Sequence, residues 1–153
     1  MIEDLDITTR LSGPARSGSD GYSSASNALR ELGELLRDQA YAFVTVTPET
    51  HQRVNARATR QGGFKARDLR EVFGWNWPFE PELLSTHMLA LLRAADALDE
   101  TPLGLRSRVR FSSLGGRLFV HSGFPTTQND AVFFGPDTYR YCKLLERWAP
   151  QAR

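Results

Sequence analysis

The clearest pattern in the chain is an alternation of side-chain character on both sides of a Gly-Gly pair. It covers residues 106–113 and returns over residues 117–122. A period of two around Gly115-Gly116 predicts a β-hairpin. On its first strand, apolar or small residues are expected on one face and arginines on the other. The arginines of that outer face are Arg106, Arg108 and Arg110.

A strand and a helix are expected after the hairpin. The apolar run Ala131–Phe134 is short enough for a buried strand, and Gly135-Pro136 ends it. Asp137 stands where an N-cap would open a helix. Apolar residues then recur at helical spacing on this final helix: Tyr141, Leu144, Leu145 and Trp148.

The first part of the chain predicts short elements behind an N-terminal tail. Residues 1–22 are rich in Ser, Gly and Pro and are expected to be flexible. Apolar residues at helical spacing predict a helix from Ser24 or Ser26 to about Gln39. Residues 42–46 are β-branched and aromatic, which is typical of a short strand.

Two short helices are expected next. Pro48 opens the first, because Thr47 before it is a good N-cap, and the helix is expected to end at about Ala56. Ala66–Phe73 predicts the second, which stops at Gly74. The aromatic residues that follow are expected in the core: Trp75, Trp77 and Phe79.

The longest amphipathic stretch begins at Pro81. Its apolar residues keep three- and four-residue spacing as far as Leu98, which predicts one helix that ends before Thr101-Pro102. His87 lies on the apolar edge of this helix and is expected to be a packing residue rather than a ligand.

The order of these elements indicates the fold class. Short helices followed by a two-stranded hairpin are typical of a winged-helix module, and here a strand and a C-terminal helix come after them. We therefore expect an α+β, winged-helix-like fold. At 153 residues, the chain is expected to hold one domain, residues 23–153, behind the tail of residues 1–22.

Composition excludes several classes of protein. The single cysteine, Cys142, rules out an internal disulfide and a cysteine-based zinc site, and it fits a cytoplasmic protein. No apolar run approaches the roughly 18 residues that span a membrane, and the acidic N-terminus is not expected to be a signal peptide. The three histidines stand far apart, and no nucleotide-binding, metalloprotease or serine-hydrolase motif is present. We therefore predict no catalytic residue and no metal site in this chain.

The net charge of +1 conceals strong local segregation. Residues 51–70 carry six basic groups and one acidic group, whereas residues 71–102 carry one basic and six acidic groups. A basic cluster with aromatic neighbours is typical of nucleic-acid binding. The predicted contacts are Arg53, Arg57, Arg60, Lys65, Arg67, Arg108, Arg110 and Arg117. Two other readings stay open, namely a solvated surface or arginines that pair with the acidic residues of 80–100.

Four segments give the chain a family resemblance: FVTVTPETHQRVNAR, DLREVFGWNWPF, VRFSSLGGRLFVHSGFPT and DAVFFGPDTYRY. Together they resemble the N-terminal region of a group of bacterial class I methyltransferases, enzymes that use S-adenosylmethionine. The resemblance covers roughly residues 40–148. It implies that a Rossmann-like catalytic domain follows such a region, and that the last of the four segments lies over the cofactor and helps to close its pocket.

Carried over residue by residue, the resemblance implies five positions nearest the cofactor: Phe134, Pro136, Asp137, Thr138 and Tyr139. The ribose-binding acid and the methyl-transfer site would lie beyond Arg153. The resemblance therefore implies an accessory region whose partner is a C-terminal catalytic domain. S-adenosylmethionine is expected in the full-length parent and not on this chain alone. Without that partner, the final segment is expected to expose an apolar patch that favours a homodimer.

Two main hypotheses on function follow. The first is a substrate-recognition and cofactor-lid domain of an S-adenosylmethionine-dependent methyltransferase, not catalytic by itself. The alternative is a stand-alone winged-helix-type module that binds RNA or DNA through the basic residues. A third hypothesis makes the aromatic stretch Trp75–Phe79 a contact for another protein.

Overall fold

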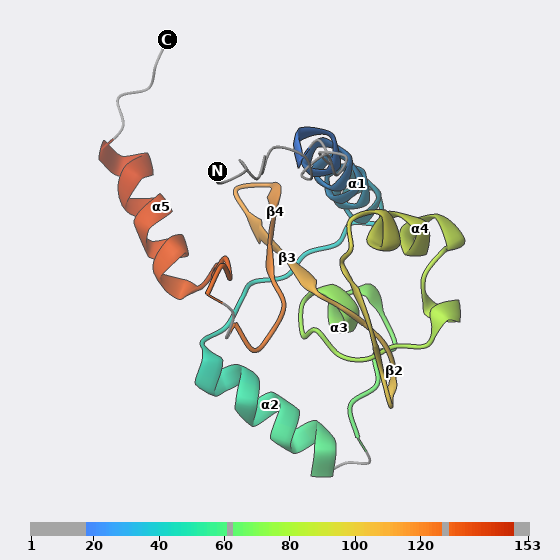
Figure 1. Cartoon of the computed structure of the whole chain (residues 1–153). Coiled ribbons are helices and arrows are strands. Elements are labelled where there is room, and N and C mark those ends of the chain that lie inside the picture. Colours follow the sequence, from blue (N-terminus) through green and yellow to red (C-terminus); the bar gives the residue numbers. More distant parts are fainter. Residues whose placement is uncertain (1–17, 61–62, 127–128, 149–153) are drawn as a thin grey trace, which may run out of the picture.

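The computed structural model of the chain describes residues 18–60, 63–126 and 129–148. Within these ranges the fold is α+β, as predicted, and Figure 1 shows its arrangement. The helices are α1 (Gly18–Asp38), α2 (Pro48–Arg60), α3 (Leu69–Phe73), the 3₁₀ helix η1 (Pro81–Leu83), α4 (Thr86–Ala94) and α5 (Pro136–Trp148). The strands are β1 (Leu98–Thr101), β2 (Gly104–Ser107), β3 (Val109–Leu114) and β4 (Arg117–Ser122).

The core lies between α1, α4, α3 and the inner face of β3. α1 packs on α4, and both helices contribute buried side chains to one core, among them Leu32, Leu36, Met88 and Leu92. Phe111 of β3 closes the core from the sheet side. The fully buried residues of α1 are four apart, which is the spacing of one helical face. The apolar pattern therefore determined which face of α1 points inward.

The helix α1 begins earlier than predicted. It starts at Gly18 rather than at Ser24 or Ser26, and thus includes residues 18–22 of the predicted tail. The remainder of that tail, residues 1–17, lies outside the described residues. α2 opens at Pro48 as predicted, with the amide of Thr50 donating to Thr47 Oγ1 at 3.3 Å, but it continues to Arg60.

The predicted hairpin is confirmed. β3 and β4 pair antiparallel, from Val109 opposite Ser122 to Leu114 opposite Arg117. Gly115 and Gly116 form the turn with φ of 56° and 73°, a left-handed conformation that glycine adopts without a Cβ clash. β3 directly continues β2, with Arg108 between them, so one long bent stretch pairs first with β1 and then with β4.

The single helix predicted from Pro81 to Leu98 is wrong. η1 ends at Leu83, and α4 begins only at Thr86, because the Ser85 side chain accepts from the amide of Met88 at 3.2 Å and caps a new helix. Leu98 belongs to β1, a strand that the sequence did not predict. α3 is also shorter than predicted, since Asp68 caps it, but Gly74 ends it as expected.

Two predicted strands are extended segments without a regular ladder. Residues 42–46 run beside the open edge of β3, where the amide of Ser113 donates to the carbonyl of Phe43 at 2.7 Å. Residues 131–134 run beside the end of β4, where the amide of Ser122 donates to the carbonyl of Val132 at 3.0 Å. Both predictions of a strand were wrong, although both segments flank the hairpin.

The start of α5 also differs from its predicted form. The helix begins at Pro136, and the carbonyl of Gly135 accepts from the amide of Thr138 at 2.9 Å. Thr138 Oγ1 in turn accepts from the amide of Gly135 at 3.5 Å, a reciprocal arrangement like a capping box. Asp137 lies inside the first turn and is not the N-cap.

Candidate functional site

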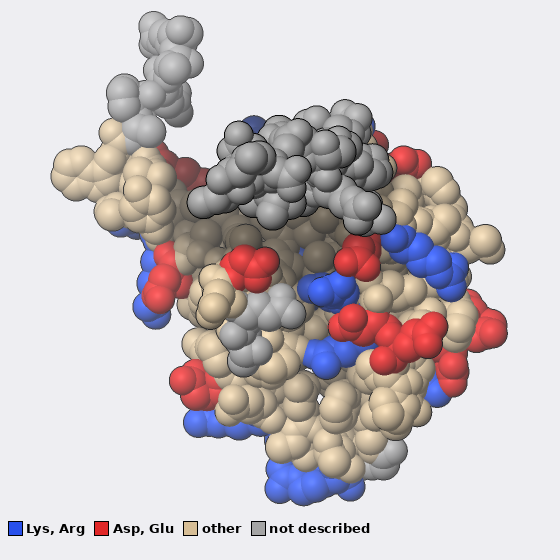
Figure 2. All heavy atoms as spheres, viewed as in Figure 1, with Lys and Arg blue, Asp and Glu red and all other residues tan. Residues whose placement is uncertain are grey.

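α2 carries the most accessible of the predicted binding residues. Arg53, Arg57 and Arg60 are exposed, and their spacing of four and three places them along one face of the helix. None of them forms an ion pair with any residue that the structure describes. Figure 2 shows basic side chains at the lower edge of the molecule, where the C-terminal end of α2 lies. This face of α2 therefore presents three exposed arginines that are not paired with acids of the described residues.

The two basic residues that follow α2 are paired with acids. Lys65 forms an ion pair with Glu80, and Arg67 Nη2 lies 2.7 Å from Glu71 Oε1. The bond from Arg67 lowers the pKa of Glu71, whereas Glu71 raises the pKa of Arg67. Pairing with nearby acids therefore describes Lys65 and Arg67 better than a shared phosphate-binding patch.

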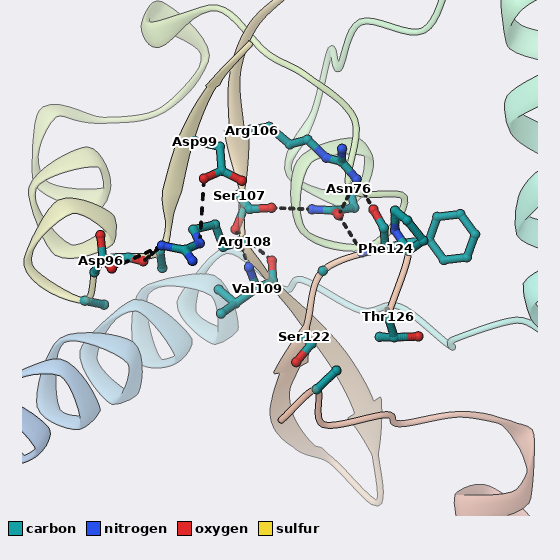
Figure 3. A pocket seen from close by; sticks show the side chains of 15 residues that line it. Asn76, Asp96, Asp99, Arg106, Ser107, Arg108, Val109, Ser122, Phe124 and Thr126 are labelled. Atoms are coloured by element: carbon teal, nitrogen blue, oxygen red, sulfur yellow. Dashed lines mark hydrogen bonds and ion pairs between the residues drawn. The ribbon is translucent and has the colours of Figure 1, made fainter. Parts of the chain in front are cut away.

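The arginines of the two hairpins do not form one surface. Arg108 lies between two acids, at 3.1 Å from Asp96 and 3.6 Å from Asp99 (Figure 3). Arg106 is half-buried and donates to Asn76. Arg117 is exposed at the start of β4, beside the β3–β4 turn. Figure 1 shows this turn at the end of the molecule away from α2. The eight predicted contacts are thus distributed over separate regions.

Arg110 is buried, so the prediction of an outward-facing arginine was wrong. Its side chain is 2% exposed, and its Nε donates to the carbonyl of Ser122 at 3.3 Å. His51 of α2, Thr45 and Phe134 contact this face of the hairpin, which the sequence pattern treated as open. Burial lowers the pKa of Arg110 to about 10, which still leaves the side chain charged at neutral pH.

His51 accepts a hydrogen bond from this buried arginine. Its Nε2 lies 2.9 Å from the carbonyl of Trp75, which only accepts, so the ring proton is on Nε2. Nδ1 is then the acceptor for Arg110 Nη1 at 3.4 Å. Burial and, secondly, the charge of Arg110 lower the pKa of His51 to about 4. Phe124 stacks on the imidazole at 4.0 Å between ring centres. His51 is therefore a neutral residue of the core.

A second buried polar group connects three elements. Ser112 Oγ lies 2.7 Å from His121 Nε2 and is also hydrogen-bonded to the hydroxyl of Thr45. Burial, followed by the charge of Arg110, lowers the pKa of His121 to about 3. Ser112 is 0% and His121 3% exposed, so neither atom is accessible to a substrate. The pair is structural and does not form a hydrolase site.

The strand register explains why this group escaped the sequence analysis. Ser112, Arg110 and His121 share one face of the hairpin because His121 lies opposite Arg110. The alternation along the two strands therefore already placed these residues on one face, but the sequence analysis took that face to be the solvent-exposed one.

The five predicted cofactor positions divide into two groups. Phe134 is buried and stacks on His121 at 5.7 Å between ring centres, and Tyr139 Oη accepts from the amide of Thr45 at 3.2 Å. These two anchor the start of α5 to the domain. Asp137 faces solvent, within 3.4 Å of Arg140, and Pro136 and Thr138 are half-buried beside it.

Beyond this anchor, α5 exposes an apolar stripe, defined by Tyr141, Leu144, Leu145 and Trp148. Their side chains are between 45% and 77% exposed. Trp148 lies nine residues after Tyr139, about two and a half helical turns, so the two side chains point in opposite directions. The stripe thus faces away from the body to which Tyr139 is fixed, and Figure 1 shows α5 at the edge of the molecule.

The described residues contain no group of three or more His, Cys, Asp or Glu that would hold a metal ion. His87, expected to be a packing residue, is instead exposed, and its Nε2 lies 2.8 Å from Glu31 Oε1. None of the described helices has the length and apolar character needed to cross a membrane.

Comparisons with known proteins do not assign a family. No family model matches the chain, and neither the curated proteins nor the solved structures contain a match.

Proposed function

We propose that this chain is the substrate-recognition and cofactor-lid domain of an S-adenosylmethionine-dependent methyltransferase and is not catalytic by itself. The resemblance of its four sequence segments to the N-terminal region of such enzymes motivates the proposal. In this proposal the domain works in the cytoplasm, and its partner is a catalytic domain that carries the cofactor.

The apolar stripe of α5 is the observation that carries the proposal. A helix that exposes four large apolar residues on one face is expected to pack against another surface. The resemblance implies a cofactor beside this same element. With the stripe on a catalytic domain, the solvent-facing start of α5 at Asp137 would lie close to the interface, where a lid residue is needed.

The anchor of α5 supports a lid that moves with its domain. Phe134 packs against Phe119 and His121, and Tyr139 bonds to Thr45, so the first turn of the helix is fixed to the hairpin. A displacement of the hairpin by bound substrate would therefore be transmitted to α5. This gives the domain a physical route between substrate recognition and closure of the cofactor pocket.

The first test is to isolate, from the cells that produce it naturally, the polypeptide that contains this sequence. We expect its intact mass to exceed the 17.2 kDa of the present chain by a catalytic domain, and we expect it to transfer methyl groups from S-adenosylmethionine. Leu144→Glu should then lower methyl transfer at least about tenfold, because it places a charge in the proposed interface.

A matched control lies on the same helix. Glu146 is exposed and lies away from the stripe, so Glu146→Lys changes charge without touching the interface and should leave transfer unchanged. Two results together would refute the proposal. The native polypeptide would have a mass near 17.2 kDa, and it would transfer no methyl groups either alone or in complex with another chain.

A second candidate is a nucleic-acid-binding module, and it rests on α2 alone. Arg53, Arg57 and Arg60 are exposed on one helical face and form no ion pair with the described residues. Binding to RNA or DNA through them should weaken as salt rises. The double variant Arg57→Glu/Arg60→Glu should abolish most of that binding. Arg30→Glu, an exposed arginine on α1, is the control that should not affect it.

A further inference from the structure

A polar pocket of about 360 Å³ lies between the loop at Asn76, the β1–β2 hairpin and the segment that follows β4 (Figure 3). Its volume is near the lower end of the range for small-molecule sites. Arg106 lies in its wall, together with short apolar side chains such as Ala97 and Val109. Neither the methyltransferase proposal nor the basic face of α2 involves this pocket.

Arg106 is held in place by neutral groups. Its Nη2 donates to Asn76 Oδ1 at 3.2 Å and to the carbonyl of Phe124. No described carboxylate lies within ion-pair distance of its guanidinium. Burial lowers the pKa of Arg106, which reflects a charge that is partly removed from water. The charge of Asp99, which lies opposite Arg106 in the β1–β2 ladder, raises this pKa, but the Asp99 carboxylate pairs with Arg108 and not with Arg106.

Asn76 is the residue that fixes this arrangement. It is 3% exposed and has a φ of 61°, a left-handed conformation that asparagine tolerates better than most residues. Its Oδ1 accepts from the amide of Phe124 at 2.7 Å as well as from Arg106, and its Nδ2 donates to the carbonyl of Ser107 at 2.6 Å. One buried amide thus joins three segments and orients the guanidinium.

The acids of the pocket set a limit on what it accepts. Asp96 and Asp99 also line the wall, and both are within 4 Å of Arg108. Two arginines and two aspartates leave little net charge, so a polyanion such as a nucleic-acid strand gains nothing here. Arg108 offsets one of the two carboxylate charges, so only a single compact anion that contacts the guanidinium of Arg106 directly can bind here.

We propose that this pocket binds a small ligand through one carboxylate or phosphate group, which the guanidinium of Arg106 holds. The short apolar side chains of the wall contact the uncharged part of the ligand. The site requires only this chain, so it stands whether or not the methyltransferase proposal does.

The test is a pair of titrations of the ¹⁵N-labelled 153-residue chain, one with inorganic phosphate and one with acetate. Saturable shifts are expected for the amides of Ser107, Gly123 and Phe124 and for the Nε–H of Arg106. Saturation with phosphate alone would identify a phosphate ligand, and saturation with acetate alone a carboxylate ligand. Shifts that do not saturate, or that centre on α2, would overturn the proposal.

Arg106→Gln removes the charge and should weaken binding about tenfold or more, the usual cost of a lost charge-assisted hydrogen bond. Arg117→Gln makes the same charge change at an exposed site outside the pocket and should leave binding unchanged. Equal binding by the two variants contradicts the proposal. The titration of the unmodified chain decides the question even where Arg106→Gln does not fold.

Discussion

At the scale of single residues, the two buried histidines make the stability of the domain depend on pH. The folded-state pKa values of His51 and His121, about 4 and about 3, lie below the ordinary value of 6.5. Between pH 6.5 and these lower pKa values, the unfolded chain therefore binds more protons than the folded chain. The stabilisation is fully present above pH 6.5 and is lost as the pH falls. At pH 4 the free energy of unfolding should be lower by about 2–3 kcal/mol for each histidine, as urea unfolding would show.

His51→Gln should remove about half of this acid-dependent loss, whatever it does to stability at neutral pH. Gln52→Ala, at an exposed residue of α2 without a titratable side chain, is the control and should leave the pH dependence intact. The explanation fails where His51→Gln loses as much stability between neutral pH and pH 4 as the unmodified chain.

At the scale of elements, one glycine sets the distance between α3 and the extended segment beside β3. A Cβ on Gly74 would lie under 3.0 Å from the ring of Phe43, which is itself buried. Gly74→Ala should therefore lower the free energy of unfolding by about 1–3 kcal/mol through overpacking, measurable by thermal or urea unfolding.

Gly33 of α1 provides the comparison. A Cβ there meets Phe111 only at 3.4 Å, and alanine favours a helix, so Gly33→Ala should be neutral or slightly stabilising. Equal losses in the two variants would show that the contact with Phe43 is not the cause.

The same scale shows what the sequence could predict. The hairpin of β3 and β4 was predictable because its turn and its alternation are local features. The break between η1 and α4 at Ser85 was not predictable, because the apolar residues keep their helical spacing on both sides of this capping serine. The burial of Arg110 was also unpredictable, because its guanidinium lies against His51 of α2, which is 59 residues away in the sequence.

The candidate site residues show the same difference between local features, which the sequence predicts, and contacts between distant segments, which it does not. Exposure of Arg53, Arg57 and Arg60 follows from the amphipathic pattern of a single helix, so their common face was predictable. The pocket at Arg106 brings together Asn76, β2 and the segment after β4. Only the three-dimensional fold places these parts side by side, and no spacing in the sequence indicates it.

At the scale of the whole molecule, the apolar stripe of α5 should determine how the isolated chain associates. Exposed apolar residues that lack a covering domain favour self-association. We expect a concentration-dependent dimer in analytical ultracentrifugation, and we expect Leu144→Glu to return the chain to a monomer. Glu146→Lys, off the stripe, should leave the dimer intact. A chain that stays monomeric at every concentration would contradict this.

The two-residue turn at Gly115-Gly116 has a consequence for how this chain tolerates insertions and deletions. Because strand side chains alternate, adding or removing one residue of β4 would shift its pairing with β3 by one position and exchange its faces. His121 would turn outward and leave Ser112 without its partner, and its place opposite Arg110 would go to Val120 after an insertion or to Ser122 after a deletion. Related sequences are therefore expected to keep the number of residues from Arg110 to His121.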